Sequence, residues 1–382
     1  MSTPHRSFPD HRRSPTLAGA LRWVLIPVVF LACDDSVSPG PDPVDGPRNE
    51  ILFISTLQGS VNEFGRTLSD IFDINADGTA RRRLTAHSND YYFLSLSPDR
   101  SRLAFYANEG GVGCFNVRVS DVEVREVTQV TGLAPDERCN VSPYWSPDGH
   151  RIGFTSSRNP DFGWDAYVMN PDGTGVVNVS RNPSVDLATS HDRVVGWTPD
   201  GRIVVHTNRE GREGTYLMSA DGSQDEPFMA DNVFLYPRWS PDGTRIVATS
   251  DRDGNWEVYV ITADRSEVMN VTLDPEYDHI PLGSRTPWSP DGSRIAFQST
   301  RSGNTDVFVV SPDGSGIVNV SNDPGRDMFM DWSPDGSRIL FASDRYGDTE
   351  LFIADADGTH LVSLTRIPSE TSWPYAIWVS GR

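Results

Sequence analysis

A short motif recurs six times along this chain and constrains its fold more than any other feature. The copies read Trp-Ser-Pro-Asp-Gly from Trp145, Trp239, Trp288 and Trp332, Trp-Thr-Pro-Asp-Gly from Trp197, and Leu-Ser-Pro-Asp-Arg from Leu96. Successive copies lie 42 to 52 residues apart, which is the period expected for the blades of a β-propeller. The period therefore predicts an all-β fold.

Each repeat has the pattern of four strands joined by sharp turns. The Ser-Pro-Asp-Gly segment is turn chemistry, because Pro presets φ, Asp bonds the nearby backbone and Gly accepts a positive φ. An alternating run follows it, as at residues 294–299, then a third strand at 306–310 and a short fourth at 317–321. A second turn, Asp313-Gly314, separates the last two. One repeat is one antiparallel blade.

The two ends of the repeat region complement each other. Residues 51–85 match the second, third and fourth strands of a blade, and residues 374–379 match a first strand. We expect the C-terminal strand to complete the N-terminal blade, because this closes the ring and removes exposed strand edges. The prediction is a seven-bladed propeller of four-stranded antiparallel blades over residues 50–382. A six-bladed ring is the alternative, with the Leu96 copy, in which Arg100 replaces Gly, as the irregular unit.

The N-terminal 33 residues have the pattern of a bacterial export signal. Basic residues precede an apolar run at 23–32, which is shorter than the roughly 20 residues that a membrane-spanning helix needs. The run ends in Phe30-Leu31-Ala32-Cys33, which resembles a lipobox with Cys33 as the lipidated residue. An ordinary cleaved signal or a buried Cys33 is the alternative. Residues 34–49, rich in Pro, Asp, Ser and Gly, are predicted to be a disordered tether.

The net charge indicates which kinds of partner the chain can bind, and the other two cysteines indicate the redox state of its compartment. Thirty-three Lys and Arg against 53 Asp and Glu give a net charge of −20, which disfavours nucleic acid and anionic lipid as partners and favours cationic ones. Cys114 lies near the connection between the second and third strands of its blade, and Cys139 lies in the following blade-to-blade connection. Both connections emerge on one face, so export to an oxidising compartment predicts a disulfide between them, with two unpaired buried thiols as the alternative.

The motif copies resemble those of the TolB family of WD40-like (PD40) propeller repeats. The wider group also includes the propellers of tricorn and of prolyl oligopeptidase-type peptidases. The resemblance covers about residues 51–382 and implies the fold more than a function, since TolB itself carries an α/β domain before its propeller and this chain passes from the tether into blades. A peptidase would need a hydrolase domain and typically a Gly-x-Ser-x-Gly elbow, neither of which the sequence contains.

The residue types that invite a chemical role have structural explanations as well. The recurring Trp could stack on sugars, but one Trp at one blade position favours packing between blades. A weak calcium-loop pattern comprises Asp251, Asp253, Asn255 and Glu257. The repeat explains it, because residues 301–306 and 345–350 occupy the same place without the doubled Asp. No cofactor is expected beyond this weak calcium candidate.

The long connections between blades carry the candidate binding residues, since loops on a rigid scaffold usually carry binding. The candidate face comprises Asp186, His191, Asp192, Glu276, Tyr277, Asp278 and His279. We therefore expect a non-enzymatic, lipid-anchored propeller of the cell envelope, facing the periplasm or the exterior, that binds an envelope protein or peptide. Its contact with the membrane would be through the anchor only. The alternative is an enzyme or a small-ligand (sugar) receptor that uses the central channel, with or without a metal. A purely structural propeller is a third possibility.

Overall fold

The computed structural model describes most of the chain after residue 49. The described residues are 50–61, 67–85, 89–109, 113–132, 138–158, 163–180, 191–208, 214–229, 234–281, 286–365 and 375–379. The predicted export signal at 1–33 with Cys33, and the predicted tether at 34–49, lie outside them. In the described part of the chain, no helix is long and apolar enough to cross a membrane.

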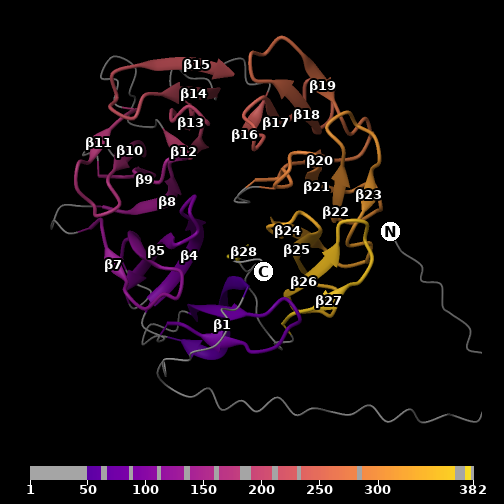
Figure 1. Cartoon of the computed structure of the whole chain (residues 1–382), viewed down its shortest axis with the longest axis horizontal. Helices are drawn as coiled ribbons and strands as arrows, with labels where there is room; N and C mark the ends of the chain where they lie inside the picture. The colour runs from indigo at the N-terminus through magenta and orange to yellow at the C-terminus, as the bar shows by residue number, and fades with distance from the viewer. Residues whose placement is uncertain are drawn as a thin grey trace, which may run out of the picture. The chain divides into compact units, whose positions relative to one another are not determined.

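The described residues form seven antiparallel sheets of four strands each, arranged as the blades of a ring (Figure 1). This confirms the predicted seven-bladed propeller. The six-bladed alternative is wrong, because the Leu96 repeat forms a complete blade of its own. Within each blade the first strand lies nearest the ring axis and the fourth lies outermost (Figure 1).

We number the blades 1 to 7 along the chain and give the strands of each from the axis outward. Blade 1 contains β28 (Tyr375–Trp378), β1 (Ile51–Val61), β2 (Thr67–Ile74) and β3 (Arg82–Arg83). Blade 2 contains β4 (Asn89–Leu96), β5 (Arg102–Glu109), β6 (Asn116–Asp121) and β7 (Thr128–Gln129). Blade 3 contains β8 (Asn140–Trp145), β9 (Ile152–Ser156), β10 (Asp165–Met169) and β11 (Val177–Asn178).

The remaining blades follow the same plan. Blade 4 contains β12 (Arg193–Trp197), β13 (Ile203–Thr207), β14 (Gly214–Met218) and β15 (Asp225–Met229). Blade 5 contains β16 (Leu235–Trp239), β17 (Arg245–Ser250), β18 (Glu257–Thr262) and β19 (Val268–Asn270). Blade 6 contains β20 (Asp278–His279), β21 (Ile295–Ser299), β22 (Asp306–Val310) and β23 (Val318–Asn319). Blade 7 contains β24 (Asp327–Trp332), β25 (Arg338–Ser343), β26 (Glu350–Asp355) and β27 (Val362–Ser363).

The C-terminal strand closes the ring as predicted. β28 pairs antiparallel with β1, so that Ile377 lies opposite Leu52. The backbone N–H of Trp378 also donates to the Asp331 carboxylate of blade 7 (2.9 Å). The strand therefore ties blade 1 to blade 7 and leaves blade 1 with a paired inner strand.

Arg100, the irregular residue of the Leu96 repeat, contributes to the same closure. The five other motif copies have Gly149, Gly201, Gly243, Gly292 and Gly336 at this position, all with positive φ. Arg100 keeps the left-handed conformation with φ 59°. Its Nη2 donates to the Trp378 carbonyl (2.7 Å) and its Nε to the Val379 carbonyl (3.4 Å). The departure from Gly thus joins blade 2 to the C-terminal strand.

Apolar side chains fill every interface between neighbouring blades. Seven buried clusters lie one to an interface. The cluster between blades 7 and 1 joins Met330 and Leu340 to Phe53 and Trp378. The closing interface is therefore packed in the same way as the others.

The recurring tryptophans belong to these interfaces, which is the packing role that the repeat predicts. Four of them donate their indole N–H to a backbone carbonyl of the preceding blade: Trp145, Trp197, Trp288 and Trp332. An arginine of the preceding blade covers several of the rings. Arg245, for example, lies 5.2 Å from the ring centroid of Trp288 and donates to the carbonyl of Gly292 (3.0 Å). These contacts link each blade to the next.

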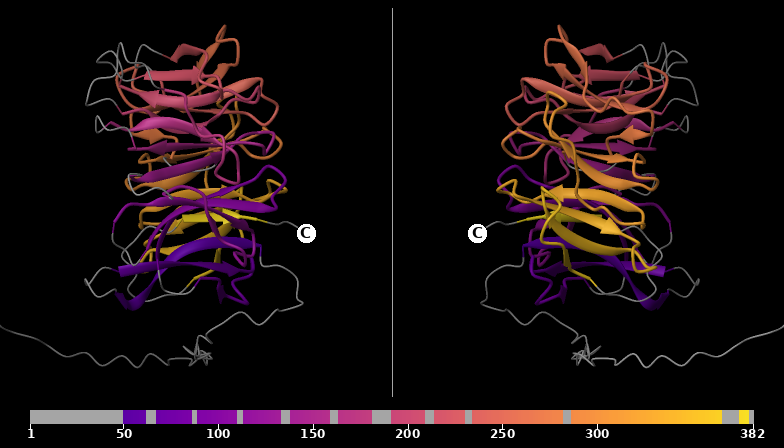
Figure 2. Two further views of the ribbon diagram at one scale, coloured as in Figure 1. Left: turned by 90° about the vertical axis from the view of Figure 1, so that its left-hand side faces the viewer. Right: turned by 90° about the vertical axis from the view of Figure 1, so that its right-hand side faces the viewer.

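The strands run between two faces of the ring, which Figure 2 shows from the side. The Ser-Pro-Asp-Gly turns lie on one face, and the second-to-third strand and blade-to-blade connections lie on the other, which we call the loop face. A disulfide joins Cys114 and Cys139 on the loop face, with a Cα–Cα distance of 4.5 Å. This is the pairing that the sequence predicts.

Candidate functional site

One connection on the loop face exposes large apolar side chains. It joins β19 of blade 5 to β20 of blade 6, and we call residues 273–277 the Leu273 loop. Leu273 is 79% exposed and Tyr277 is 47% exposed. The Tyr277 ring lies beside Trp256 and His279, at centroid distances of 6.2 and 5.7 Å. Apolar groups held in solvent mark a candidate interaction surface.

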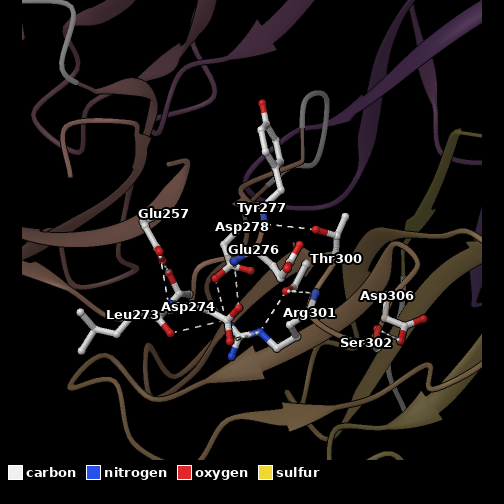
Figure 3. Close-up of polar contacts among 12 residues, drawn as sticks. Glu257, Leu273, Asp274, Glu276, Tyr277, Asp278, Thr300, Arg301, Ser302 and Asp306 are labelled. Atoms are coloured by element: carbon white, nitrogen blue, oxygen red, sulfur yellow. Dashed lines mark hydrogen bonds and ion pairs between the residues drawn. The ribbon is translucent and has the colours of Figure 1, made fainter. Parts of the chain in front are cut away.

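A buried polar network holds this loop in place (Figure 3). Glu257, only 3% exposed, accepts hydrogen bonds from the Thr272 hydroxyl and from the backbone N–H of Asp274 (3.2 Å). The Asn255 amide donates to the Glu257 carboxylate (2.7 Å) and to the carbonyls of Asp274 (2.7 Å) and Glu276 (3.0 Å). Hydrogen bonds to a charged carboxylate are among the stronger ones. The exposed side chains therefore stand on a fixed backbone.

Blade 6 fixes the other end of the loop. The backbone N–H of Tyr277 donates to the Thr300 hydroxyl (3.1 Å), and the N–H of Thr300 donates to the Tyr277 carbonyl (3.0 Å). Arg301 donates to the fully buried Asp278 carboxylate (2.6 Å). Burial raises the pKa of Asp278 to about 6, although Ser299 and Arg301 act in the opposite direction. Figure 3 shows the ion pair beneath the loop and the Tyr277 ring pointing away from it.

The same frame recurs at the next blade interface. Residues 322–327 correspond to 273–278, and the Asn304 amide donates there to Asp306 (2.8 Å) and to the carbonyls of Asp323 (2.7 Å) and Gly325 (2.6 Å). Arg345 pairs with the buried Asp327 at 3.4 Å. The frame is thus a structural part of the repeat.

The two connections differ in the residues placed on the frame. Leu273, Glu276 and Tyr277 stand where the next connection has Asn322, Gly325 and Arg326. Leu273 has φ 43° and Asn322 has φ 34°, and the matching residue after blade 2 is Gly132 with φ 72°. Asn and Gly tolerate this left-handed conformation, whereas Leu does not favour it. Leu273 is therefore a strained and exposed residue that lies outside the hydrophobic clusters of the described residues.

The predicted binding residues belong to two different connections of the loop face. Asp186 lies outside the described residues, and His191 and Asp192 belong to the connection between blades 3 and 4. His191 is exposed, whereas Asp192 is fully buried. The other four belong to the Leu273 loop or its end: Glu276, Tyr277, Asp278 and His279. Of these, Asp278 supports the loop from below, and His279 is half-buried against Tyr277.

The weak calcium pattern forms part of the frame. Asp253 accepts from the Tyr259 hydroxyl (2.6 Å), and Asn255 and Glu257 bond to each other (2.7 Å), while the Asp251 carbonyl accepts from Gly254 in a turn (3.0 Å). Across the described residues, no group of three or more His, Cys, Asp or Glu side chains is placed to hold a metal ion. The repeat therefore accounts for the pattern, because Asn304 takes the role of Asn255 in the next blade.

The surroundings of the Leu273 loop are acidic. Asp251, Asp253 and Glu276 are exposed, and Asp274 is half-buried. Three arginines of the described residues lie close by. The guanidinium of Arg252 is 5.0 Å from the ring centroid of Phe234. Arg301 pairs with Asp274 and Asp278, and burial and the exposed Arg326 both lower the pKa of His279. An exposed apolar pair within such a charge distribution suits a partner that presents an apolar group flanked by cations.

Two residues of this site were missed by sequence reasoning. Leu273 was overlooked because a single Leu is unremarkable in a sequence, and the residue at this position varies from repeat to repeat. Arg301 was assigned to a repeated loop, and nothing in the sequence states that its partner is the buried Asp278.

Comparisons with known proteins agree with the fold. Residues 283–375 match the model of the TolB beta propeller domain, PD40. The chain is 27% identical over 131 residues to the protein TolB homolog of Chlorobium luteolum, covering 34% of this chain and 28% of that protein. It is also 27% identical over 123 residues to the Tol-Pal system protein TolB of Desulfosudis oleivorans, covering 32% and 26%. The chain thus spans little more than a quarter of the length of these relatives.

A solved structure shows a similar β-propeller fold. The β-propeller domain of the Trilobed protease from Pyrococcus furiosus superimposes with a TM-score of 0.59 at 15% identity, over 84% of this chain and 96% of that one. At this identity the likeness concerns the fold alone.

Proposed function

We propose that this chain is a non-enzymatic binding protein of the bacterial cell envelope, and that its propeller holds a protein or peptide on the Leu273 loop. The observation that carries the proposal is a strained Leu273, 79% exposed, on a backbone that Glu257 and Asn255 hold rigid. Leu273 belongs to no hydrophobic cluster of the described residues, and a strained, exposed apolar residue of this kind is best explained by a partner outside the molecule. The similarity to TolB proteins supports the envelope as the compartment.

The partner that fits this surface presents an apolar side chain with basic residues on either side of it. Leu273 and Tyr277 offer apolar area, and Asp251, Asp253 and Glu276 offer negative charge around it. Charge complementarity of this kind steers association and selects against acidic partners.

The mature chain would be held at a membrane through lipidated Cys33. This proposal rests on the lipobox resemblance of residues 30–33. A Cys33→Ala variant should lose fatty-acid labelling and move from the membrane fraction to the soluble fraction of the envelope. Unchanged fractionation would contradict the anchor but would leave the binding surface untouched.

Photocrosslinking in intact envelopes tests the binding surface. A photoreactive phenylalanine at Tyr277 should yield a discrete crosslinked product, and the Leu273→Asn change should remove it. The matched control is Tyr346, which is 63% exposed in another connection and should give no such product. Equal crosslinking from both positions would contradict a site at the Leu273 loop.

The alternative is a propeller enzyme or a sugar receptor that acts at the ring axis. Its metal-dependent form finds no candidate ligand group within the described ranges. Its metal-free form is favoured by one observation, the buried guanidinium of Arg238 near the axis.

A further inference from the structure

Aromatic side chains gather at the inner strands of blades 1, 2 and 3, and these strands surround the ring axis (Figure 1). Phe93 of β4 is their centre, with ring centroids 5.1 Å from Tyr144, 6.2 Å from Tyr375 and 6.3 Å from Tyr106. These residues come from three different blades. Tyr106, Tyr144 and Tyr375 are only partly buried, and Tyr144 and Tyr375 also pack against the neighbouring interface clusters.

The backbone is strained in the same strands. Phe93, Ser142 and Tyr236 lie in β4, β8 and β16, each three residues before the first residue of its motif copy, and have φ values of 58°, 53° and 55°. The pairing of these strands with their neighbours shifts register here, as a β-bulge does. Left-handed conformations of bulky residues are costly and concentrate at binding and active sites. The bulges redirect side chains of the inner strands.

Arg238 of β16 is the unusual polar residue of this region. It is 8% exposed, and within the described ranges its hydrogen bond is from Nη1 to the neighbouring Pro237 carbonyl (3.2 Å). Its Nε is buried without a partner, and no carboxylate pairs with it in the part of the chain that the structure describes. A buried cation without a counter-charge is destabilising unless a ligand supplies one.

Arg238 and the tyrosines Tyr144, Tyr236 and Tyr375 are close enough to interact electrostatically. Burial raises the pKa of the Tyr144 hydroxyl, the positive charge of Arg238 lowers it, and Tyr375 and Tyr236 raise it. These residues belong to blades 1, 3 and 5, which are not neighbours. They can act on one another only if they face the common axis.

Open space lies beside Gly196 in the inner strand of blade 4. Arg238 and Tyr144 each directly precede the Trp of their motif copies, and the residue at this position in the intervening blade 4 is Gly196. A Cβ added to Gly196 would meet no atom within 4 Å. Blade 4 therefore leaves room where its neighbours carry a tyrosine and an arginine.

We propose that Arg238, together with Tyr144 and Tyr236, binds a small ligand that carries a carboxylate on a ring. The planar guanidinium matches a carboxylate through two parallel hydrogen bonds. The hydroxyls of Tyr144 and Tyr236 have no hydrogen-bond partner among the described residues and can donate to the same group. The aromatic rings offer faces for a flat or pyranose ring. The ligand is an aromatic acid or an acidic sugar, and its site is separate from the Leu273 loop.

Calorimetric titration of the full exported chain tests this proposal and separates the two sources of the carboxylate. The probes are benzoate and glucuronate, with benzamide and glucose as their neutral counterparts. The wild type should bind one or both acids and neither neutral compound. Binding of benzoate alone identifies an aromatic acid, and binding of glucuronate alone identifies an acidic sugar. No binding of either acid at about 10 mM, a concentration that reveals even millimolar affinity, would overturn the proposal.

Variants show whether Arg238 carries the binding. Arg238→Gln should raise the Kd of the bound acid roughly 10- to 100-fold, because a charge-assisted pair is lost. Tyr144→Phe should raise this Kd several-fold. The matched control is Arg125→Gln, since Arg125 is 65% exposed and pairs with Asp121, and it should bind as the wild type does. Unchanged binding by Arg238→Gln would overturn the proposal.

A stability readout distinguishes a ligand-binding arginine from a structural one. Without ligand, Arg238→Gln should raise the Tm by roughly 2 °C or more, because an uncompensated buried charge is removed. A large fall in Tm would assign Arg238 to the architecture of blade 5 and would also overturn the proposal.

Discussion

Arg100 and Leu273 are two of the residues in this propeller that carry a bulky side chain in a left-handed backbone conformation where at least one other repeat has Gly or Asn. Arg100 replaces the motif Gly and reaches back into the molecule to the carbonyls of the closing strand. Leu273 stands where two other repeats have Gly132 and Asn322, and it extends into solvent. Each substitution costs about 1–2 kcal/mol in backbone energy. A substituted side chain that bonds within the molecule, as that of Arg100 does, stabilises the fold, whereas one that extends into solvent, as that of Leu273 does, is available to bind a partner.

The largest expected effect breaks the closure that Arg100 supports. Trp378→Ala removes a fully buried indole at the meeting of blades 7 and 1, and should lower the free energy of unfolding by about 3–5 kcal/mol. Urea denaturation measures it. Trp239, which is half-buried, provides the control, and its Ala variant should lose clearly less. Equal losses would mean that the closing interface is no more important than another.

Substitutions at Arg100 measure how much its bonds to the closing strand contribute to stability. Arg100→Ala retains the backbone strain and loses the hydrogen bonds to the Trp378 and Val379 carbonyls, so it should destabilise the fold by about 1.5–3 kcal/mol. Arg100→Gly loses the same bonds but relieves the strain, so its loss should be smaller by about 1 kcal/mol. If the Gly variant exceeded the wild type in chemical denaturation by the full strain relief of about 1 kcal/mol, the bonds to β28 would contribute nothing.

Asp278, beneath the Leu273 loop, predicts a pH dependence. Its folded-state pKa is raised by burial from 3.8 to about 6, so its protonated form is favoured by folding. The resulting stability is fully present below pH 3.8 and is lost as the pH rises through 6. Asp278→Asn should therefore reduce the fall in unfolding free energy between pH 4 and 7 by about 1–2 kcal/mol.

A turn carboxylate provides the control for this pH dependence. Hydrogen bonds from Ser240 and Thr244 lower the pKa of Asp242 to about 2, so its contribution is present above pH 3.8 and is lost as the pH falls through 2. Asp242→Asn should leave the profile between pH 4 and 7 unchanged in shape. Identical profiles for Asp278→Asn and the wild type would refute the raised pKa.

Features set by local chemistry could be predicted from the sequence. The Pro-Asp-Gly turns and the alternating runs depend on neighbouring residues, so the period determined the blade count, and the absence of a first strand before Ile51 predicted its pairing with residues near Ile377. The packing role of the tryptophans followed from their repetition. Arg100 was noticed as irregular, but its contact with Trp378 depends on the closed ring and could not be predicted.

The candidate site could be predicted only in part. Glu276 and Tyr277 were placed on the loop face by their position in a connection, and both are exposed. Asp278, one residue further, is fully buried because β20 begins there and Arg301 pairs with it. Arg238 and Tyr144 approach the axis through bulges and through the space beside Gly196. The positions of these side chains depend on tertiary contacts, which cannot be inferred from the repeat period of the sequence.

The Leu273→Asn variant, with stability and partner capture measured on the same preparation, tests the central claim most directly. Asn tolerates the left-handed backbone, and the lost side chain is mostly in solvent, so the free energy of unfolding should rise by about 1 kcal/mol. The crosslink from Tyr277 should disappear at the same time. The reciprocal control, Asn322→Leu, should lose about 1 kcal/mol and gain no crosslink. A Leu273→Asn protein that keeps its crosslink, or that loses stability, would contradict the account.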